Sequence, residues 1–271
     1  MSLRILIAVF KKDFQVLKKY KLNLLTTFFS ILFYILIIFF FSETFIIKDS
    51  IFENNNQSSL FLFFLSGLLL IDLTVTCASN LPLTINFYQT SGIMEELISD
   101  FKIFLLTIIF SISLPFLISL TKFFVYLLLA KFVLNQDIAF SLQTLFLIPY
   151  FFIYLLCIAG IGLTASSLTI LFKRGNPIIQ LNNIFTISLT GAFIPISQLG
   201  WIVDSISNFL PAKHYLDILR SILGLYDLNS ASIISSSIWL AFLSLIFFLI
   251  GMFVFKQAIN YAKLNDNISD Y

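Results

Sequence analysis

Six stretches of the chain carry no charged residue, or a single one, over a length that could cross a bilayer. A membrane-spanning helix needs about 20 apolar residues, and an ionised side chain at the bilayer centre costs about 2.5 to 3.5 kcal/mol on insertion scales. Polar and apolar residues do not alternate in these stretches, so we expect helices rather than the strands of a barrel. The chain is therefore predicted to be an all-α integral membrane protein. The six predicted spans cover about residues 22–42, 59–79, 103–130, 145–171, 178–196 and 233–255.

The composition indicates the same class. Hydrophobic residues make up 59% of the chain and charged residues 11%, whereas a soluble domain carries about 25% charged residues. The net charge of +2 is spread over many loops, so nucleic acid is not an expected partner. One histidine, His214, and two cysteines, Cys77 and Cys157, exclude a disulfide scaffold and a histidine-rich metal site. We expect a single domain over residues 1–271, with no metal and no cofactor.

Lysine and arginine predict the orientation, since cytoplasmic loops carry an excess of both. Six spans place the two termini on one side, and that side would carry eleven of the sixteen basic residues. Both termini are therefore expected in the cytoplasm, with the protein in the inner (plasma) membrane. The first span lacks a small-x-small cleavage site, so we expect it to be retained.

Residues 1–21 predict an amphipathic helix that lies at the membrane interface. Apolar residues recur every three or four positions, and basic residues occupy much of the remaining surface. Such a helix could be a simple positive-inside anchor or could dock a cytoplasmic partner, and position does not separate the two. The apolar residues are Leu3, Leu6, Ile7, Phe10, Phe14 and Leu17.

Two patterns suggest chemistry that we do not expect here. Gly160, Gly162 and Ala165 match G-x-G-x-x-A, but mid-membrane small residues favour close packing of two helices over dinucleotide binding. Glu95 and Glu96 are adjacent, yet no histidine lies in the membrane to complete a hydrolase site. The sequence contains no G-x-x-x-x-G-K-[ST] motif, so it has no P-loop of its own for ATP. We predict no catalytic residue and no enzyme activity in this chain.

Asp72 and Lys122 are the charged residues inside predicted spans. Asp72 must face protein or water, and it is either part of a translocation path or a buried acid bonded to Thr74, Thr76 or a neighbouring helix. The two spans run in opposite directions, and at about 1.5 Å per residue the two charges differ in height by roughly 10 to 14 Å. A direct pair is therefore not expected, and Lys122 is predicted to extend outward to water.

Further motifs follow one another along the chain. Ser91 to Leu97 is similar to a G-T-[LM]-E-x-[LI] segment, with Ile93 in place of Thr. Gly160 to Leu163 precedes a basic turn of Lys173 and Arg174. Gly191 to Ile196 resembles S-G-x-x-[FY]-P-x, with Thr190 in place of Ser. Leu210 and Pro211, followed by Tyr215, Leu216, Asp217 and Arg220, resemble an L-P-x-x-[YH]-x-x-[DE]-x-x-R element.

Together with the basic amphipathic helix, these motifs resemble the permease subunit of type-2 ATP-binding cassette (ABC) transporters over nearly the whole chain. The resemblance implies a connecting helix at the N-terminus and a coupling segment at residues 86–102 that a separate ATPase subunit grips. It implies coupling roles for Gly92, Met94, Glu95, Glu96 and Leu97, and a cytoplasmic basic turn at Lys173 and Arg174. The residues expected in the pathway or its gating are Asp72, Gly191, Pro195, Pro211, Asp217 and Arg220.

Elementary physics agrees with several of these roles. Gly191 and Pro195 would loosen or end a helix near the outer surface. Pro211 suits the first turn of a short external re-entrant helix before the last span, which Gly224 could stop. Lys213, Asp217 and Arg220 are spaced for mutual neutralisation. Residues 86–102 form an acidic segment whose apolar side is expected to need a partner.

In the resembled family two permeases, identical or closely related, assemble with two ATPase subunits that bind the ATP. The expected function is ATP-driven export of an amphipathic drug-like molecule, a lipid or a glycolipid. The alternative is an ion-coupled secondary transporter or channel without an ATPase partner. A non-transporting membrane scaffold or enzyme subunit is the third hypothesis.

Overall fold

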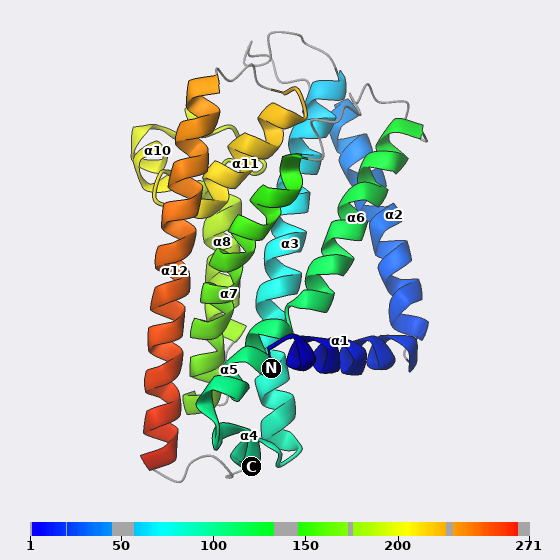
Figure 1. Ribbon diagram of the computed structural model, residues 1–271. Helices are drawn as coiled ribbons and strands as arrows, with labels where there is room; N and C mark the ends of the chain where they lie inside the picture. The colour runs from blue at the N-terminus through cyan, green and yellow to red at the C-terminus, as the bar shows by residue number, and fades with distance from the viewer. Residues whose placement is uncertain are drawn as a thin grey trace.

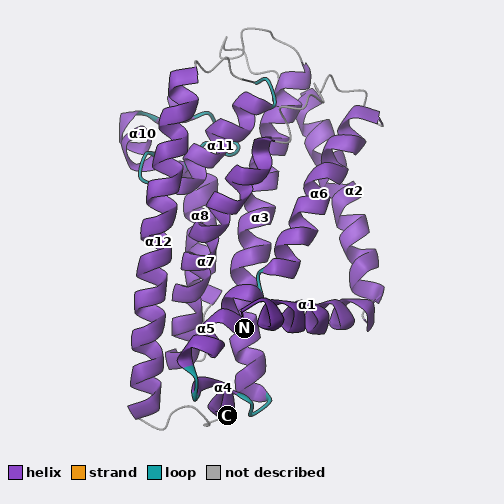
Figure 2. Cartoon of the chain, viewed as in Figure 1, coloured by secondary structure: helices purple, strands orange, loops and turns teal. Residues whose placement is uncertain are grey.

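The computed structural model describes residues 2–19, 21–44, 57–132, 146–172, 176–225 and 230–264, and this part of the chain contains helices and loops without a strand (Figures 1 and 2). The all-α prediction is confirmed for these residues. The helices are α1 (Ser2–Lys19), α2 (Lys21–Thr44), α3 (Gln57–Thr90), α4 (Met94–Ile98), α5 (Phe101–Phe110), α6 (Ser113–Phe132), α7 (Leu147–Phe172), α8 (Asn176–Leu189), α9 (Ile196–Leu199), α10 (Trp201–Ser207), α11 (Pro211–Ile222) and α12 (Ser230–Leu264).

Five stretches of the described residues are long and apolar enough to cross a membrane: 25–42, 60–90, 101–132, 147–172 and 232–264. They correspond to five of the six predicted spans. The remaining prediction, 178–196, overlaps α8, whose 14 residues reach roughly 21 Å against a hydrocarbon core of about 30 Å. The count of six spans is thus not confirmed. The chain nevertheless leaves α7 at the lower end of Figure 1 and enters α12 at the upper end.

Small residues bring α7 against two neighbours. A Cβ built on Gly160 would overlap the carbonyl oxygen of Phe247 in α12, and a Cβ built on Gly251 would overlap the carbonyl oxygen of Gly160. On the α3 side, a Cβ on Gly162 would lie 2.7 Å from the Cδ1 atom of Leu81. Close helix packing was the expected use of the G-x-G-x-x-A pattern, and it is confirmed.

The predicted third span is broken into α5 and α6 at residues 111–112. Pro115 explains the break, because proline lacks the N–H that would bond the carbonyl four residues earlier, at Ser111, and its ring crowds that carbonyl. The side chain of Asn80 in α3 donates to the Ser111 carbonyl instead, at 2.7 Å. After the break α6 is inclined to α3 (Figure 1).

Residues 2–19 form the predicted amphipathic helix, α1. It lies across the lower part of the molecule at a steep angle to the spans (Figure 1) and contacts α2, α5 and α6. Val9 is buried in this contact, whereas Phe14 and Lys18 stay exposed.

Candidate functional site

The predicted coupling segment turns the chain between α3 and α5. Gly92 adopts a φ of 71° just after α3, which favours glycine, and its N–H donates to the Gln89 carbonyl at 3.1 Å. The five residues of α4 follow. Asp100 then caps α5 by accepting from the N–H groups of Lys102 and Ile103 at 3.0 and 3.2 Å. The segment is a tight helical turn at the lower end of Figure 1.

The apolar side of α4 is not open to a partner, which corrects the sequence prediction. Met94 and Ile98 are 1% and 2% exposed and belong to the core of the subunit itself. Ile93 and Glu96 are exposed and Leu97 is half-buried. The side chain of Glu95 lies outside the described residues. Because the segment turns back onto α3 and α5, Met94 and Ile98 pack within the chain, and Ile93 and Glu96 form an exposed edge.

Lys12 joins α1 to the same end of α3. Its Nζ donates to the Tyr88 hydroxyl at 3.3 Å, lies 5.1 Å from the centre of the Tyr88 ring, and pairs with Asp13 at 3.3 Å. Burial alone would lower the pKa of Lys12, but the attraction of Tyr88 and Asp13 prevails and the pKa lies above its ordinary value. Lys12 therefore stays charged, and the amphipathic helix is attached to the helix that leads into the coupling segment.

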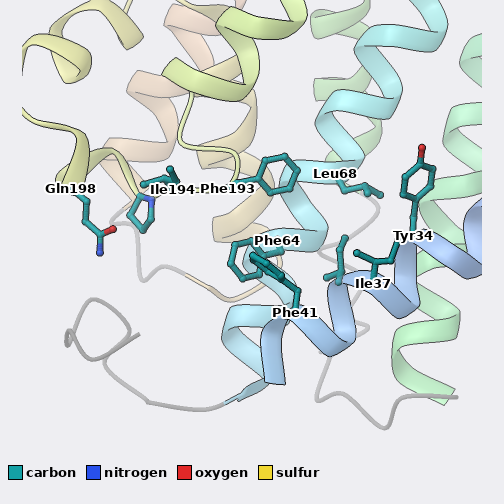
Figure 3. A pocket seen from close by; sticks show the side chains of 10 residues that line it. Tyr34, Ile37, Phe41, Phe64, Leu68, Phe193, Ile194 and Gln198 are labelled. Carbon is teal, nitrogen blue, oxygen red and sulfur yellow. The ribbon is translucent and has the colours of Figure 1, made fainter. Parts of the chain in front are cut away.

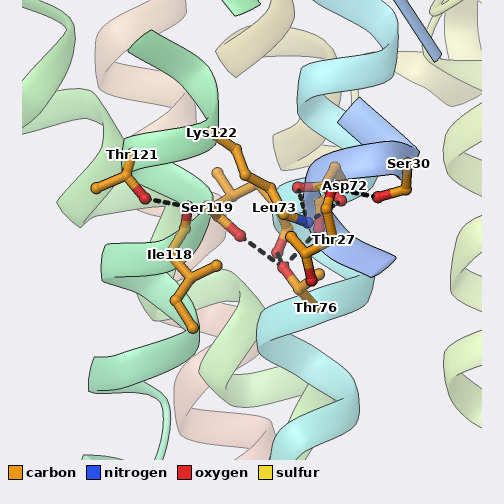
Figure 4. A network of polar contacts seen from close by, with 9 residues as sticks. All are labelled: Thr27, Ser30, Asp72, Leu73, Thr76, Ile118, Ser119, Thr121 and Lys122. Carbon is orange, nitrogen blue, oxygen red and sulfur yellow. Dashed lines mark hydrogen bonds and ion pairs between the residues drawn. The ribbon is translucent and has the colours of Figure 1, made fainter. Parts of the chain in front are cut away.

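Asp72 and Lys122 form an ion pair between α3 and α6, so the expectation that they stay apart was wrong (Figure 4). The Nζ of Lys122 lies 3.0 Å from Oδ1 and 3.2 Å from Oδ2 of Asp72, and the two side chains are 13% and 23% exposed. The expected separation assumed straight, upright helices, whereas α6 is inclined beyond the break at residues 111–112. Of the alternatives for Asp72, a bond to a neighbouring helix is observed.

Hydroxyl groups extend this polar contact along the same two helices. The Thr76 hydroxyl lies 2.6 Å from the Ser119 hydroxyl and also donates to the backbone carbonyl of Asp72 at 2.6 Å. Thr74 instead faces α7, where its hydroxyl lies 2.9 Å from that of Tyr154. Polar groups therefore connect α3 to α6 and to α7 within the membrane-spanning part.

At the opposite end of α3, Arg220 of α11 is 3% exposed and bonded to two parts of the chain, α3 and the turn after α8. Its Nε donates to the Ser66 hydroxyl at 3.0 Å, and its Nη2 donates to the carbonyls of Gly191 and Ala192 at 3.0 Å and of Phe63 at 3.3 Å. The guanidinium carbon lies 3.7 Å from the centre of the Phe63 ring. We call this set of contacts the Arg220 clamp.

The backbone around the clamp follows the sequence predictions in part. Gly191 has a φ of 74° and α8 ends before it, earlier than the predicted end of the span at residue 196. Pro211 occupies the first turn of α11, and Gly224 follows its end with a φ of 78°, as expected. The Leu225 N–H donates to the Arg220 carbonyl at 3.0 Å, which completes a Schellman motif.

The three charged residues of α11 are arranged differently from the predicted mutual neutralisation. Lys213 donates to Asp204 of α10 at 3.1 Å and to the Asn208 side chain at 2.6 Å. Asp217 is partly buried, and burial raises its pKa to about 6 although Lys213 and Arg220 act in the opposite direction. Burial has the opposite effect on His214, whose pKa it lowers, because the charged form of histidine is the protonated one. Arg220 uses its charge on α3 and the Gly191 turn.

A groove of about 740 Å³ opens beside the clamp, between α2, α3 and the segment after α8 (Figure 3). Phe64, Leu68 and Phe193 line it, together with Pro195, one of the predicted pathway residues. Gln198 and the Tyr34 hydroxyl are its polar groups. The volume falls within the range of about 300 to 1,000 Å³ for small-molecule sites.

A family model described as ABC-2 type transporter matches residues 5–223, about four-fifths of the chain. The chain belongs to the ABC-2 type transporter family. It is an ABC transporter permease and a multi-pass membrane protein, and the resemblance drawn from its motifs is confirmed. The family implies an ABC ATPase as partner. No curated protein matches the chain.

The permease brings some predicted site residues together and separates others. Gly191 and Arg220 meet in the clamp, with Pro195 in the adjoining groove, while Gly92, Met94 and the other coupling residues lie at the opposite end of α3. Lys173 and Arg174 lie outside the described residues.

Sequence reasoning missed the contribution of α3 to the clamp. Ser66 accepts from Arg220, and a Cβ on Gly67 would overlap the Ala192 carbonyl oxygen. The signal was a serine and glycine pair inside a run of phenylalanine and leucine.

Proposed function

We propose that this permease forms half of the translocation pathway of an ATP-driven exporter and that residues 86–102 couple it to a separate ATPase subunit. The observation that carries the proposal is the continuity of α3. This one helix of 34 residues, roughly 51 Å long, starts near the Arg220 clamp, carries Asp72, and ends at the turn that precedes α4. A displacement of α4 therefore moves a helix that reaches the opposite end of the subunit.

The packing of α4 supports this transmission. Met94 and Ile98 are buried, so α4 is fixed to the subunit rather than hanging from a loose loop. Glu96 and Ile93 remain available outside for a partner. A partner that binds this edge would shift α3 and α5 together. The ATPase supplies the energy, and this chain supplies the path and performs no chemistry.

The groove supports an amphipathic cargo. Its aromatic and aliphatic lining suits the apolar part of a drug-like molecule, a lipid or a glycolipid, and Gln198 could bond a polar part. The expected complex has two permeases, as a homodimer, and two ATPase subunits, with both termini of each permease in the cytoplasm and the cargo moving outward. Family membership favours this function over an ion-coupled transporter, for which the Asp72–Lys122 pair is the supporting observation.

Charge reversal of the coupling edge tests the proposal. In the co-purified complex in vesicles, Glu96→Lys should lower permease-dependent ATP hydrolysis and transport several-fold, because Glu96 lies on the exposed edge of α4. The control is Gln257→Lys, which adds a positive charge at an exposed position of α12. Equal coupling in Glu96→Lys and the unmodified protein would contradict the role of α4. Transport by the permease without any ATPase would contradict ATP drive.

The cargo assignment has its own test. Ile37→Trp should narrow the groove and reduce uptake of a fluorescent amphipathic dye into inverted vesicles, with little effect on ATPase binding. Phe33→Trp, on the same helix and outside the groove lining, is the matched control. Equal dye uptake by both variants would exclude the groove from the cargo path.

A further inference from the structure

A second groove, of about 460 Å³, lies between α1 and α6. One stripe of α1 lines it, with Phe10, Phe14 and Lys18 spaced four residues apart, and the facing stripe of α6 includes Leu114 and Leu117. The rings of Phe10 and Phe14 are stacked with centroids 6.3 Å apart. This groove is therefore apolar along its length and carries a cation on its α1 side. We call it the α1–α6 groove.

The ammonium group of Lys18 makes no ion pair within the described part of the chain. Its neighbour Lys12 is paired with Asp13, whereas no acid of the described residues lies within ion-pair distance of Lys18. Lys11, Lys18 and Lys19 are all exposed on α1. The groove beside α2 and α3 differs in this respect, because no charged residue lines it.

The position of the groove relative to the membrane decides what fits it. The amphipathic α1 crosses the lower part of the molecule, while α6 belongs to a predicted span, so the groove lies in the angle between an interfacial helix and a membrane helix (Figure 1). A lipid seated there would direct its acyl chain along α6 and its headgroup toward α1. Basic residues at the membrane surface attract anionic headgroups.

We infer that the α1–α6 groove binds an anionic phospholipid of the surrounding leaflet, with its phosphate at Lys18 and an acyl chain against Phe14, Leu114 and Leu117. The lipid is a resident ligand and not the cargo. It fills the apolar angle and holds α1 against α6, the helix that carries Lys122 of the intramembrane ion pair. Phe14 and Leu117 are 56% and 46% exposed without it.

Native mass spectrometry of the full-length permease in detergent, titrated with phosphatidylglycerol or with phosphatidylcholine, tests this site. We expect preferential retention of one phosphatidylglycerol. Lys18→Gln should weaken that retention about fivefold, the factor that corresponds to the roughly 1 kcal/mol contributed by one basic residue near an anionic surface. Lys19→Gln removes the same charge from the same helix outside the groove lining, so its effect should stay within about twofold.

A second pair of variants tests the apolar part. Leu117→Trp should fill the groove and lower phosphatidylglycerol retention, whereas Leu128→Trp, also exposed on α6 but outside the groove lining, should not. Equal losses in Lys18→Gln and Lys19→Gln would reduce the effect to general surface attraction and overturn the site. Equal retention of the two lipids would also overturn it. Each variant is first checked for a single monodisperse species, and the lysine pair decides the question if a tryptophan variant fails that check.

Discussion

The two ends of α3 are held in different ways. Near its start, the buried guanidinium of Arg220 bonds four oxygen atoms, and Gly67 lies against the backbone of the turn after α8. At its other end a short helix is anchored by two buried side chains, Met94 and Ile98, beside exposed Glu96. A buried charge that must stay bonded makes the first end stiff. The second end can shift with a smaller loss of stabilising contacts. This difference fits the proposed role of α4 in coupling to the ATPase.

Loss of the Arg220 clamp should have the largest effect. Arg220→Ala should lower the free energy of unfolding by about 3 kcal/mol or more, because buried acceptors on α3 and on the Gly191 turn lose a charged donor. Thermal unfolding in detergent measures the change. Lys213→Ala removes an ion pair with the more exposed Asp204, so it should cost no more than about 1 kcal/mol. Similar losses in both variants would contradict a special stiffness of the clamp.

Loss of the Asp72–Lys122 ion pair, in the middle of α3, should lower the stability of the protein. Asp72→Asn should lower the free energy of unfolding by about 2 kcal/mol, because it removes the counterion of Lys122 within the membrane-spanning part. The double variant Asp72→Asn with Lys122→Met should be closer to the unmodified protein than Asp72→Asn alone. A double-mutant cycle in detergent, with transport as a second readout, checks both statements. Strictly additive losses would show that the pair contributes no coupling.

Five of the six spans were predictable because exclusion of charge from the bilayer is a local property of sequence. The break after α5 also had a local signal, Pro115, which hydropathy alone does not use. The Asp72–Lys122 pair required the inclination of α6, which follows from that break and from packing. The Arg220 clamp required knowing that α11 folds back onto α3, a contact between residues 154 positions apart. Local sequence patterns therefore predicted most of the helices and the order of the motifs. Tertiary packing determined which charged residues came into contact.

Substitution of Gly67 and of Gly92 by alanine compares the stability loss at the two ends of α3 directly. Gly67→Ala places a methyl group against the Ala192 backbone, which cannot rotate away, and should lower stability by about 2 kcal/mol. Gly92→Ala meets no atom within 4 Å, so only its φ of 71° opposes it, at about 1 kcal/mol. Unfolding midpoints of the two variants test the order. A larger loss for Gly92→Ala would reverse the assignment of the stiff and the compliant end.

The smallest effects should appear as a pH dependence near the clamp. Asp217 has a pKa raised to about 6, so the folded protein binds its proton more tightly than the unfolded chain. That contribution is complete below about pH 4 and is lost as the pH rises through about 6. Asp217→Asn should therefore raise the unfolding midpoint at neutral pH and leave it nearly unchanged at low pH.

His214 has the opposite sign, because burial lowers its pKa. Its contribution is present above about pH 6.5 and is lost as the pH falls below that value. His214→Gln should therefore flatten the decline of stability on acidification, while Asp217→Asn flattens the decline on alkalinisation. Unfolding midpoints across the acid to neutral range separate the two. Unaltered slopes in both variants would show that α11 is hydrated enough to screen these groups, and the clamp end of α3 would then be less rigidly enclosed than the contacts of Arg220 indicate.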